Sequence, residues 1–157
     1  MTRSEFEHRF LPHWQRMYAL AARMLGSRED ARDAVQDAFE RLLDLGERLD
    51  EVKEPGAFCL TMIRRICIDR LRRSTAAVTV PIDTHDAPVE PPSGDTDDSA
   101  RILRAIDRLP VDQAIVIKLR AIEGLDNRQI EAETGFSSDK VRQALCRARR
   151  KLKEILQ

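Results

Sequence analysis

The sequence is most informative between residues 124 and 151, where the chain runs GLDNRQIEAETGFSSDKVRQALCRARRK. Asp126 can cap a short helix that continues to about Thr134, and Gly135 then turns the chain. Ser137 or Ser138 starts a final helix with apolar residues at spacings of three and four. Two helices joined at a glycine, the second long and basic, predict a helix-turn-helix motif.

The final helix has one apolar and one polar face. Its apolar face carries Val141, Leu145, Ala148, Leu152 and Ile155. The polar face suits phosphates and base edges in a DNA major groove. The candidate DNA-binding residues of this helix are Ser138, Lys140, Arg142, Gln143 and Arg147, and Arg150 and Lys151 continue the same face.

Two shorter helices are expected before this motif. Apolar residues from Ile102 to Leu109 predict a short helix that stops before Pro110. Pro110 opens the next helix, whose inward side chains run from Val111 to Ile122, and Gly124 ends it. We therefore place a second domain at residues 98–157.

A change of composition separates this domain from the rest of the chain. Residues 76–99 contain no basic side chain, six acidic side chains and four prolines. Proline removes backbone donors and like charges repel, so no packed core is expected there. We predict an acidic, Pro-rich linker at residues 76–97 between domains at residues 1–75 and 98–157. The alternative is a disordered surface loop within one domain.

The first domain opens with a predicted helix that starts at the capping box Ser4-x-x-Glu7. Its apolar stripe comprises Phe6, Phe10, Trp14, Met17, Tyr18, Ala21 and Leu25. An aromatic stripe at helical spacing is typical of core, although it could also form a stacking platform for bases. The stripe is therefore assigned to the core.

A second helix is expected after Ser27-x-x-Asp30, which resembles another cap. Its inward side chains are Ala31, Val35, Ala38, Phe39 and Leu42, and its outward face includes Asp33, Gln36, Asp37 and Arg41. Charge alone would make this outward face a solvated surface rather than a docking site.

A third helix is expected from Ala57 to about Arg73, with Pro55 at its first turn. Its basic side chains can project away from the apolar side: Arg64, Arg65, Arg72 and Arg73. Such a strip could face phosphates, or it could merely complement the negative end of the helix dipole. The cluster by itself leaves these two interpretations open.

Composition supports an all-α fold made of two small helical domains. The 157 residues carry 27 basic and 27 acidic side chains, 34% of the chain is charged, and only seven residues are aromatic and six are glycine. Strand-rich folds depend on aromatic and turn residues, so they are disfavoured. The absence of a long apolar run or a secretory signal predicts a soluble, cytoplasmic protein without direct membrane insertion.

The sequence shows no motif typical of a catalytic or metal-binding site. It contains no Gly-rich phosphate loop and no H-x-x-x-H pattern, and its three histidines stand in unlike contexts. The three cysteines form no C-x-x-C pair, so we expect buried thiols rather than disulfides or a zinc site. We expect a protein that is not an enzyme and needs neither cofactor nor metal.

Five segments in order resemble a known family. They are DARDAVQDAF at residues 30–39, IDRLRR at 68–73, LP at 109–110, EGL at 123–125 and RAR at 147–149. Together they resemble the extracytoplasmic-function (ECF) group of bacterial sigma-70-type sigma factors. The short stretch LGERLDEVKEP at residues 45–55 is also similar to the iron-transport branch of that group.

The resemblance implies a promoter-specificity subunit of RNA polymerase. Asp33, Gln36, Asp37 and Arg41 would dock on the clamp of core RNA polymerase. Arg64, Arg65 and Arg72, with Arg73 beside them, would lie against the minus-ten element, and the loop from Asp50 to Lys53 would hold a flipped base. The last helix would recognise the minus-thirty-five element, and the linker would thread the polymerase channel for RNA.

Further expectations follow for partners. An anti-sigma factor would hold the protein inactive, because the chain offers no sensor module of its own. The competing hypothesis is a stand-alone helix-turn-helix regulator that binds duplex DNA without polymerase.

The sequence departs from the family pattern at four positions. Arg65 stands where the family usually has Asn, and Leu43 where it usually has an aromatic residue. In the first helix of the helix-turn-helix, Glu131 replaces a small alanine and Thr134 replaces a core leucine. An unpaired buried carboxylate is costly, so we expect this helix to be rotated or exposed, or Glu131 to pair with an arginine.

Overall fold

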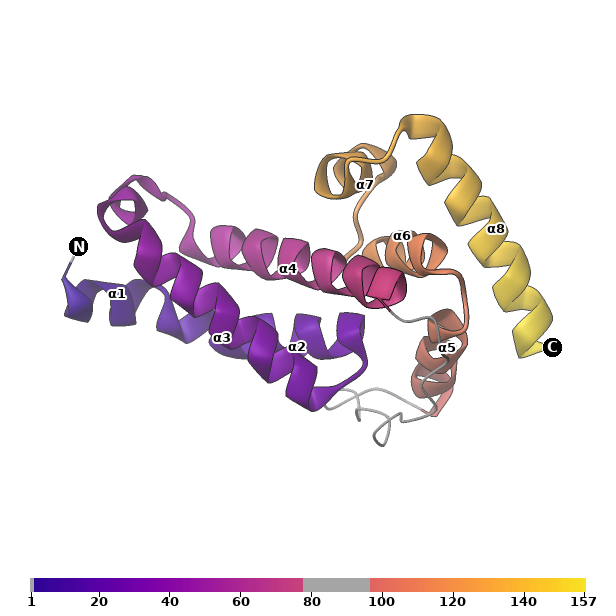
Figure 1. Cartoon of the computed structure of the whole chain (residues 1–157), viewed down its shortest axis with the longest axis horizontal. Helices are drawn as coiled ribbons and strands as arrows, with labels where there is room; N and C mark the ends of the chain where they lie inside the picture. Colours follow the sequence, from indigo (N-terminus) through magenta and orange to yellow (C-terminus); the bar gives the residue numbers. More distant parts are fainter. Residues whose placement is uncertain (1, 78–96) are drawn as a thin grey trace. The chain divides into compact units, whose positions relative to one another are not determined.

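The computed structural model describes residues 2–77 and 97–157, and every regular element in these two ranges is helical (Figure 1). The all-α prediction is therefore confirmed. The elements are α1 (Arg3–Arg9), η1 (Leu11–His13), α2 (Trp14–Leu25), α3 (Arg28–Leu45), η2 (Gly46–Glu51), α4 (Pro55–Ala77), α5 (Asp97–Asp107), α6 (Val111–Ala121), α7 (Asn127–Thr134) and α8 (Ser138–Leu156). Most of the predicted linker lies outside the described residues.

The chain divides into two compact units, Met1–Cys67 and Ile68–Gln157, which are described separately. The first unit begins differently from the prediction. Thr2, not Ser4, caps α1: its hydroxyl accepts from the Glu5 amide at 3.1 Å, and the Glu5 carboxylate accepts from the Thr2 amide at 3.2 Å. The capping box therefore lies two residues earlier than expected.

The predicted continuous first helix is also interrupted. The helix α1 ends at Arg9, the 3₁₀ turn η1 contains Pro12, and α2 then starts at Trp14. Proline lacks an N–H donor and its ring clashes with the preceding turn, so a continuous helix is blocked here. The break changes the register of the apolar stripe, and Trp14 is 47% exposed rather than buried.

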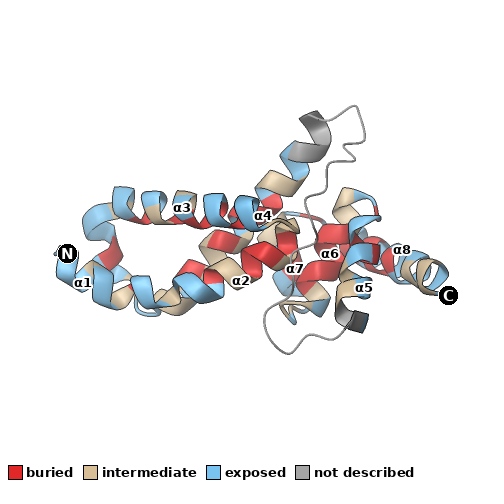
Figure 2. Ribbon diagram, turned by 90° about the horizontal axis from the view of Figure 1, so that it is seen from below, coloured by how far each residue is buried: buried red, intermediate tan, exposed pale blue. Residues whose placement is uncertain are grey.

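The core of the first unit forms mainly between α2 and α3, as the buried residues in Figure 2 show. The Ser27 hydroxyl accepts from the Asp30 amide at 3.2 Å, which confirms the predicted cap of α3. Small side chains at the contact let two helices approach closely. The buried residues of the pair are Met17, Leu20, Ala21, Ala22 and Met24 on α2, and Ala31, Ala34, Val35, Ala38 and Leu42 on α3.

Helix α4 begins at Pro55, within its predicted first turn, and extends to Ala77, four residues beyond its predicted end. Its buried side chains, Cys59, Ile63, Ile66, Cys67 and Ile68, lie at helical spacings. Phe58, Met62 and Leu71, which we assigned to the core, are only half-buried.

In the second unit, α8 packs against α5, α6 and α7. Pro110 lies directly before α6, as predicted, and Leu109, Ile115, Leu119, Ile130, Val141 and Leu145 form much of the core. The sequence did not predict that Lys118 of α6 is also buried, with only 2% of its side chain exposed. Its Nζ lies 2.8 Å from Oδ1 of Asp107, so the buried charge is paired and links α6 to the end of α5.

Candidate polymerase-binding and nucleic-acid-binding surfaces

The outward face of α3 carries the four residues that we predicted to dock on polymerase. Asp33, Gln36 and Arg41 are exposed and Asp37 is half-buried. The Arg41 guanidinium donates to both carboxylate oxygens of Asp37, at 3.2 and 3.1 Å. This bidentate pair fixes the direction of both side chains. Beside it, the Gln36 amide donates to the Glu40 carboxylate at 3.5 Å.

An apolar hollow of about 380 Å³ lies next to this face, and the sequence analysis missed it. Its lining residues are Leu11, Trp14, Tyr18, Arg32, Val35, Gln36 and Phe39. Leu11 and Trp14 are 40% and 47% exposed. Pro12 was the signal that could have revealed it, because a break in the helix there turns both side chains away from the core.

The loop after α3 contains the predicted base-holding residues Asp50 and Lys53, and both are exposed. The loop is ordered by η2, by the buried side chain of Leu49 and by a bond from the Val52 amide to the Leu49 carbonyl at 3.1 Å. Arg9 of α1 donates to the Leu49 carbonyl at 3.3 Å and also to the Val52 carbonyl. Arg9 thereby links helix α1 to the loop after α3, although the two are distant in sequence.

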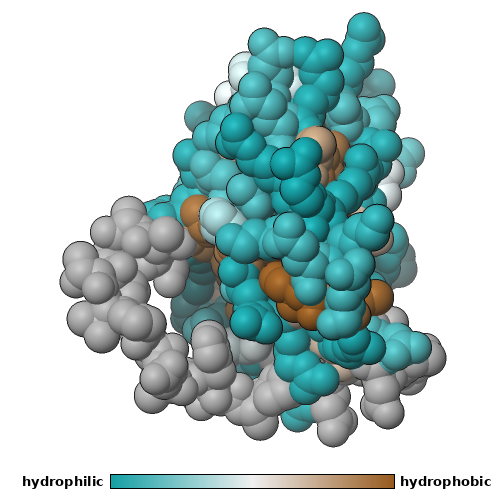
Figure 3. Space-filling view, turned by 90° about the vertical axis from the view of Figure 1, so that its right-hand side faces the viewer, coloured by the Kyte–Doolittle hydropathy of each residue, from teal (hydrophilic) through white to brown (hydrophobic). Residues whose placement is uncertain are grey.

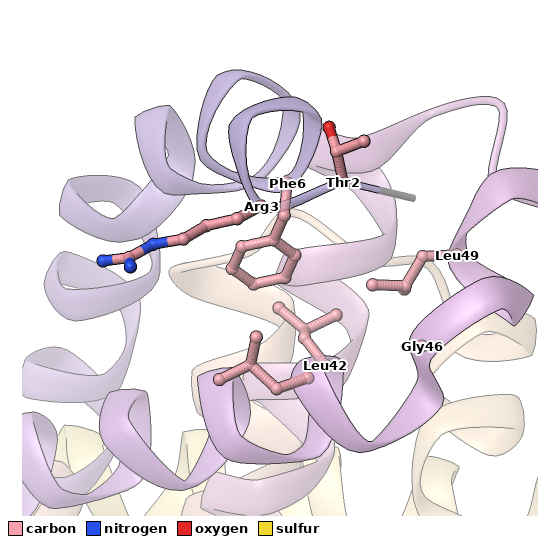
Figure 4. Close-up of a pocket in the computed structure, with 7 residues that line it drawn as sticks. Thr2, Arg3, Phe6, Leu42, Gly46 and Leu49 are labelled. Atoms are coloured by element: carbon pink, nitrogen blue, oxygen red, sulfur yellow. The ribbon is translucent and has the colours of Figure 1, made fainter.

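A second hollow, of about 240 Å³, lies where α1, the end of α3 and η2 meet (Figure 4). It is lined by Thr2, Arg3, Phe6, Leu42, Leu43, Gly46 and Leu49. Leu43, at the position where we expected an aromatic residue, is 61% exposed. An apolar side chain therefore does reach the solvent beside the loop.

The arginines of α4 do not form one uniform strip. At 100° per residue, positions 65 and 72 fall on nearly the same line of the helix, whereas 64 and 73 fall on opposite flanks. Arg65, Arg72 and Arg73 are exposed, and Arg64 is half-buried. Arg73 forms an exposed ion pair with Asp69 at 3.0 Å. Arg65 and Arg72 thus share one line of the helix, but Arg72 is held within its own unit: its Nε lies 3.5 Å from Oδ1 of Asp112, and its guanidinium lies 5.0 Å from the centre of the Phe136 ring.

The helix-turn-helix is built as predicted. A capping box joins Asp126 and Gln129 at the start of α7, and Gly135 adopts the left-handed conformation with φ 77° after its end. Of the two candidate caps, Ser137 is the one used: its hydroxyl accepts from the Lys140 amide at 3.1 Å at the start of α8. Local sequence signals are sufficient to define this motif.

Thr134 fits the motif by hydrogen bonding rather than by packing. Its hydroxyl donates to the Ile130 carbonyl at 2.7 Å and accepts from the Phe136 amide at 3.1 Å. Phe136 is buried and supplies apolar volume close to the turn. Glu131 is half-buried. The structure therefore shows partial burial at this position, and the expected rotation, exposure or pairing of Glu131 stays a prediction.

All five predicted DNA-binding residues of α8 are exposed: Ser138, Lys140, Arg142, Gln143 and Arg147. The side of the chain shown in Figure 3 is largely hydrophilic. Lys140 is held by its own domain, because its Nζ lies 2.9 Å from Asp112 and 4.0 Å from the centre of the Phe136 ring. Arg142 pairs with Asp139 one turn before it.

The cysteine prediction is right for two of three residues. Cys59 and Cys67 are buried, whereas Cys146 is exposed. Burial raises the pKa of the Cys59 thiol to about 11, so it stays protonated at neutral pH. Within residues 2–77 and 97–157, no group of His, Cys, Asp and Glu side chains is arranged to hold a metal. Among the helices described, none has the length and apolar character needed to cross a membrane.

Comparison with known families identifies both units. Residues 10–77 match sigma-70 region 2, and residues 99–152 match sigma-70 region 4. This chain belongs to the sigma-70 family. Its relatives carry ECF names, as the sequence motifs predicted.

Two relatives of this sigma-70-family chain come from Mycobacterium tuberculosis. The probable ECF RNA polymerase sigma factor SigI is 31% identical over 146 residues, which cover 86% of this chain and 50% of SigI. ECF RNA polymerase sigma factor SigM is 27% identical over 157 residues, which cover 98% of this chain and 78% of SigM. The chain therefore spans about half the length of SigI.

The fold is similar to that of sigma factor RpoE from Bartonella quintana, whose structure was solved in complex with the anti-sigma factor NepR. The TM-score is 0.68 at 19% identity, and the match covers 98% of this chain and 97% of RpoE. This similarity supports the helical architecture of the sigma-70-family chain.

Proposed function

We propose that this chain is a promoter-specificity subunit of bacterial RNA polymerase, which binds core enzyme, recognises promoter elements and initiates transcription. The observation that carries the proposal is the presence of sigma-70 regions 2 and 4 in one chain, at residues 10–77 and 99–152. In region 2, helix α3 has exposed polar side chains on the face expected to contact polymerase. In region 4, helix α8 has exposed polar side chains on the face expected to contact DNA.

Three segments divide the work in this proposal. Residues 1–75 bind polymerase and the minus-ten element, residues 76–97 form the acidic linker, and residues 98–157 bind the minus-thirty-five element. The polymerase contact is made by the face of α3 around Gln36 and the Asp37–Arg41 pair. The neighbouring hollow with Trp14 gives this face an apolar part, which a stable protein interface needs beside its charges.

DNA is contacted from both domains. Arg65 and Arg72, flanked by Arg64 and Arg73, contact phosphates near the minus-ten element, and Asp50 and Lys53 border the flipped base. Gln143 and Arg147, with Ser138 and Arg142, face the minus-thirty-five element. For both Arg72 and Lys140, a phosphate must compete with Asp112 and the Phe136 ring for the cationic group, so each of them contributes less than its charge alone suggests.

The test is reconstitution of the full chain with core RNA polymerase. We expect co-elution of the two on size exclusion, and transcripts from templates selected out of a random promoter library. A stand-alone helix-turn-helix regulator would instead bind duplex DNA without polymerase and yield no transcript. Failure to co-elute would exclude the polymerase-subunit proposal.

A regulatory partner is part of the proposal. We expect an anti-sigma factor to cover both domains of this chain in the cytoplasm, where RNA polymerase acts. Its expected effect is loss of co-elution with core enzyme when the two proteins are mixed before polymerase is added. Polymerase binding that is unaffected by every protein encoded next to this gene would contradict this part.

The short stretch before Pro55 supports membership of the iron-transport branch. In that case transcription from the promoters selected in vitro rises when the host is deprived of iron. Transcription that does not respond to iron would remove the branch assignment and leave the wider function intact.

A further inference from the structure

We propose that Arg9 is a positioning residue that sets promoter selectivity by fixing the loop of residues 46–54, although it contacts no DNA itself. The inference rests on the proposed function, since the loop carries the base-holding residues Asp50 and Lys53. Arg9 lies at the end of α1, just before residue 10, where the match to sigma-70 region 2 begins.

Arg9 is hydrogen bonded to the backbone of the loop at two points. Its guanidinium donates to the Leu49 carbonyl at 3.3 Å through Nη1 and to the Val52 carbonyl through Nη2. The Leu49 carbonyl directly precedes Asp50, and the Val52 carbonyl directly precedes Lys53. A planar guanidinium can bond two acceptors with its fork of donors, whereas an ammonium group is a single point charge. Arg9 therefore fixes the backbone directly before each of the two residues that would border the base, Asp50 and Lys53.

The packing around the loop is incomplete. The hollow of about 240 Å³ between α1, α3 and η2 means that apolar contacts alone do not fill this junction (Figure 4). Leu49 is buried, but Asp50, Glu51 and Lys53 are exposed. The bonds from Arg9 therefore add a polar constraint to the loop beside the buried side chain of Leu49.

Helix α1 is held in place by aromatic contacts. The ring of Phe6 stacks on that of Phe10 at 5.4 Å and meets the ring of Phe39 edge-on at 6.4 Å. Phe10 is fully buried. These contacts fix α1 against the core, so Arg9 projects from a rigid element. A loop ordered before binding loses less conformational entropy when it closes on a base.

The experiment uses holoenzyme made from the full chain and core RNA polymerase. Variants Arg9→Met and Arg9→Lys are compared with Arg3→Met, which removes an exposed arginine from the same helix. Strand opening is followed with a fluorescent base analogue in the minus-ten element. The templates are the preferred promoter selected by wild-type holoenzyme from a library randomised at that element, and versions with single changes in it.

We expect Arg9→Met to bind core enzyme as well as wild type but to lose about tenfold in opening of the preferred promoter, which corresponds to loss of a charge-assisted bond. Opening of the altered promoters falls less, so selectivity declines. Arg9→Lys lies between, since it keeps one bond, and Arg3→Met matches wild type. Amide exchange at Val52 becomes faster in Arg9→Met.

An equal loss on all promoters, with unchanged selectivity, would overturn the proposal and leave Arg9 with a purely structural role. Unchanged opening in Arg9→Met would overturn it as well. Failure of the wild-type chain to bind core enzyme or to open any promoter would instead count against the proposed function.

Discussion

Thr134 and Phe136 show how single residues keep a motif intact when its usual core residue is missing. The hydroxyl of Thr134 bonds to one backbone group on each side of the turn, and the Phe136 ring is buried beside it. A half-buried hydroxyl that satisfies two backbone groups costs little, whereas an unsatisfied one would destabilise the turn. The departure from the family pattern therefore leaves the helix-turn-helix in place.

The cysteines make a prediction at the residue scale. We expect the exposed Cys146 to react quickly with a thiol reagent at pH 8, and Cys59 and Cys67 to react only on unfolding. Because the pKa of Cys59 is raised from 9.0 to about 11, the unfolded chain loses this proton first. Its contribution to stability is therefore complete below pH 9.0 and is lost as the pH rises toward 11.

Urea unfolding of wild type and Cys59→Ala across pH 8–11 measures how much the Cys59 thiol contributes to the free energy of unfolding. The stability difference between the two proteins should shrink as the pH rises. More than one fast-reacting thiol in the native protein would contradict the observed burial.

Gly56 gives a second prediction at this scale. A Cβ at this position would lie 3.1 Å from Cε1 and 3.3 Å from Nδ1 of the His13 ring. Alanine favours a helix over glycine by up to about 1 kcal/mol, but crowding in a packed site costs roughly 1–3 kcal/mol. We expect Gly56→Ala to destabilise the wild-type chain and to stabilise a His13→Ala background.

A double-mutant cycle in urea, followed by helicity and by the fluorescence of Trp14, checks this expectation. Trp14 is the sole tryptophan of the sequence, so the signal comes from the first unit. Additive effects of the two substitutions would show that the ring moves aside freely.

Helix α3 combines a face that packs in the core with an outward face that we propose binds polymerase. Its inward face is mostly alanine, which lets α2 approach closely, while its outward face is charged. Partly exposed ion pairs such as Arg41–Asp37, whose side chains are 49% and 29% exposed, contribute little to stability, typically about 0–1 kcal/mol. The outward face can therefore be altered without unfolding the helix.

We predict that Gln36→Ala combined with Asp37→Arg abolishes co-elution with core RNA polymerase and leaves helicity unchanged. The substitution removes an amide and reverses a charge in the proposed docking face. The matched control is Asp98→Arg with Gln157→Ala, which makes the same two changes at exposed positions of the second unit. If the α3 variant still co-elutes with core RNA polymerase, this face is not part of the polymerase interface.

At the scale of the whole molecule, zero net charge conceals an uneven distribution. Residues 76–99 carry six acidic side chains and no basic one, whereas residues 100–157 carry 13 basic and eight acidic side chains. In the proposed function, attraction to DNA depends on local basic faces rather than on overall charge. The two domains proposed to bind DNA are then expected to contribute in different ways.

We predict that arginines of α4 and α8 differ in how they affect promoter binding. Arg64→Ala and Arg72→Ala should each lower the slope of log affinity against log salt by about 0.9, on cognate and scrambled promoters alike. Arg142→Ala should cost roughly 1–3 kcal/mol on the cognate promoter only. Binding of holoenzyme to both templates across a salt series measures this. Equal weakening of both by Arg142→Ala would make α8 an electrostatic clamp without base recognition.

The sequence by itself determined the features that depend on near neighbours. The caps at Ser27, Asp126 and Ser137, the turn at Gly135 and the apolar spacing of α8 defined the helices and the helix-turn-helix. Such signals act within a few residues, so they survive in the folded chain. Ordered motifs along the chain were enough to indicate the family.

Only the tertiary structure decided which side chains meet across the fold. The exposure of Trp14 follows from the break at Pro12 together with packing on α3, and burial of Lys118 depends on Asp107 of another helix. Arg9 and the carbonyls that it bonds are about 40 residues apart. Helical periodicity carries no information on partners at such separations, because those contacts are fixed by how whole helices pack.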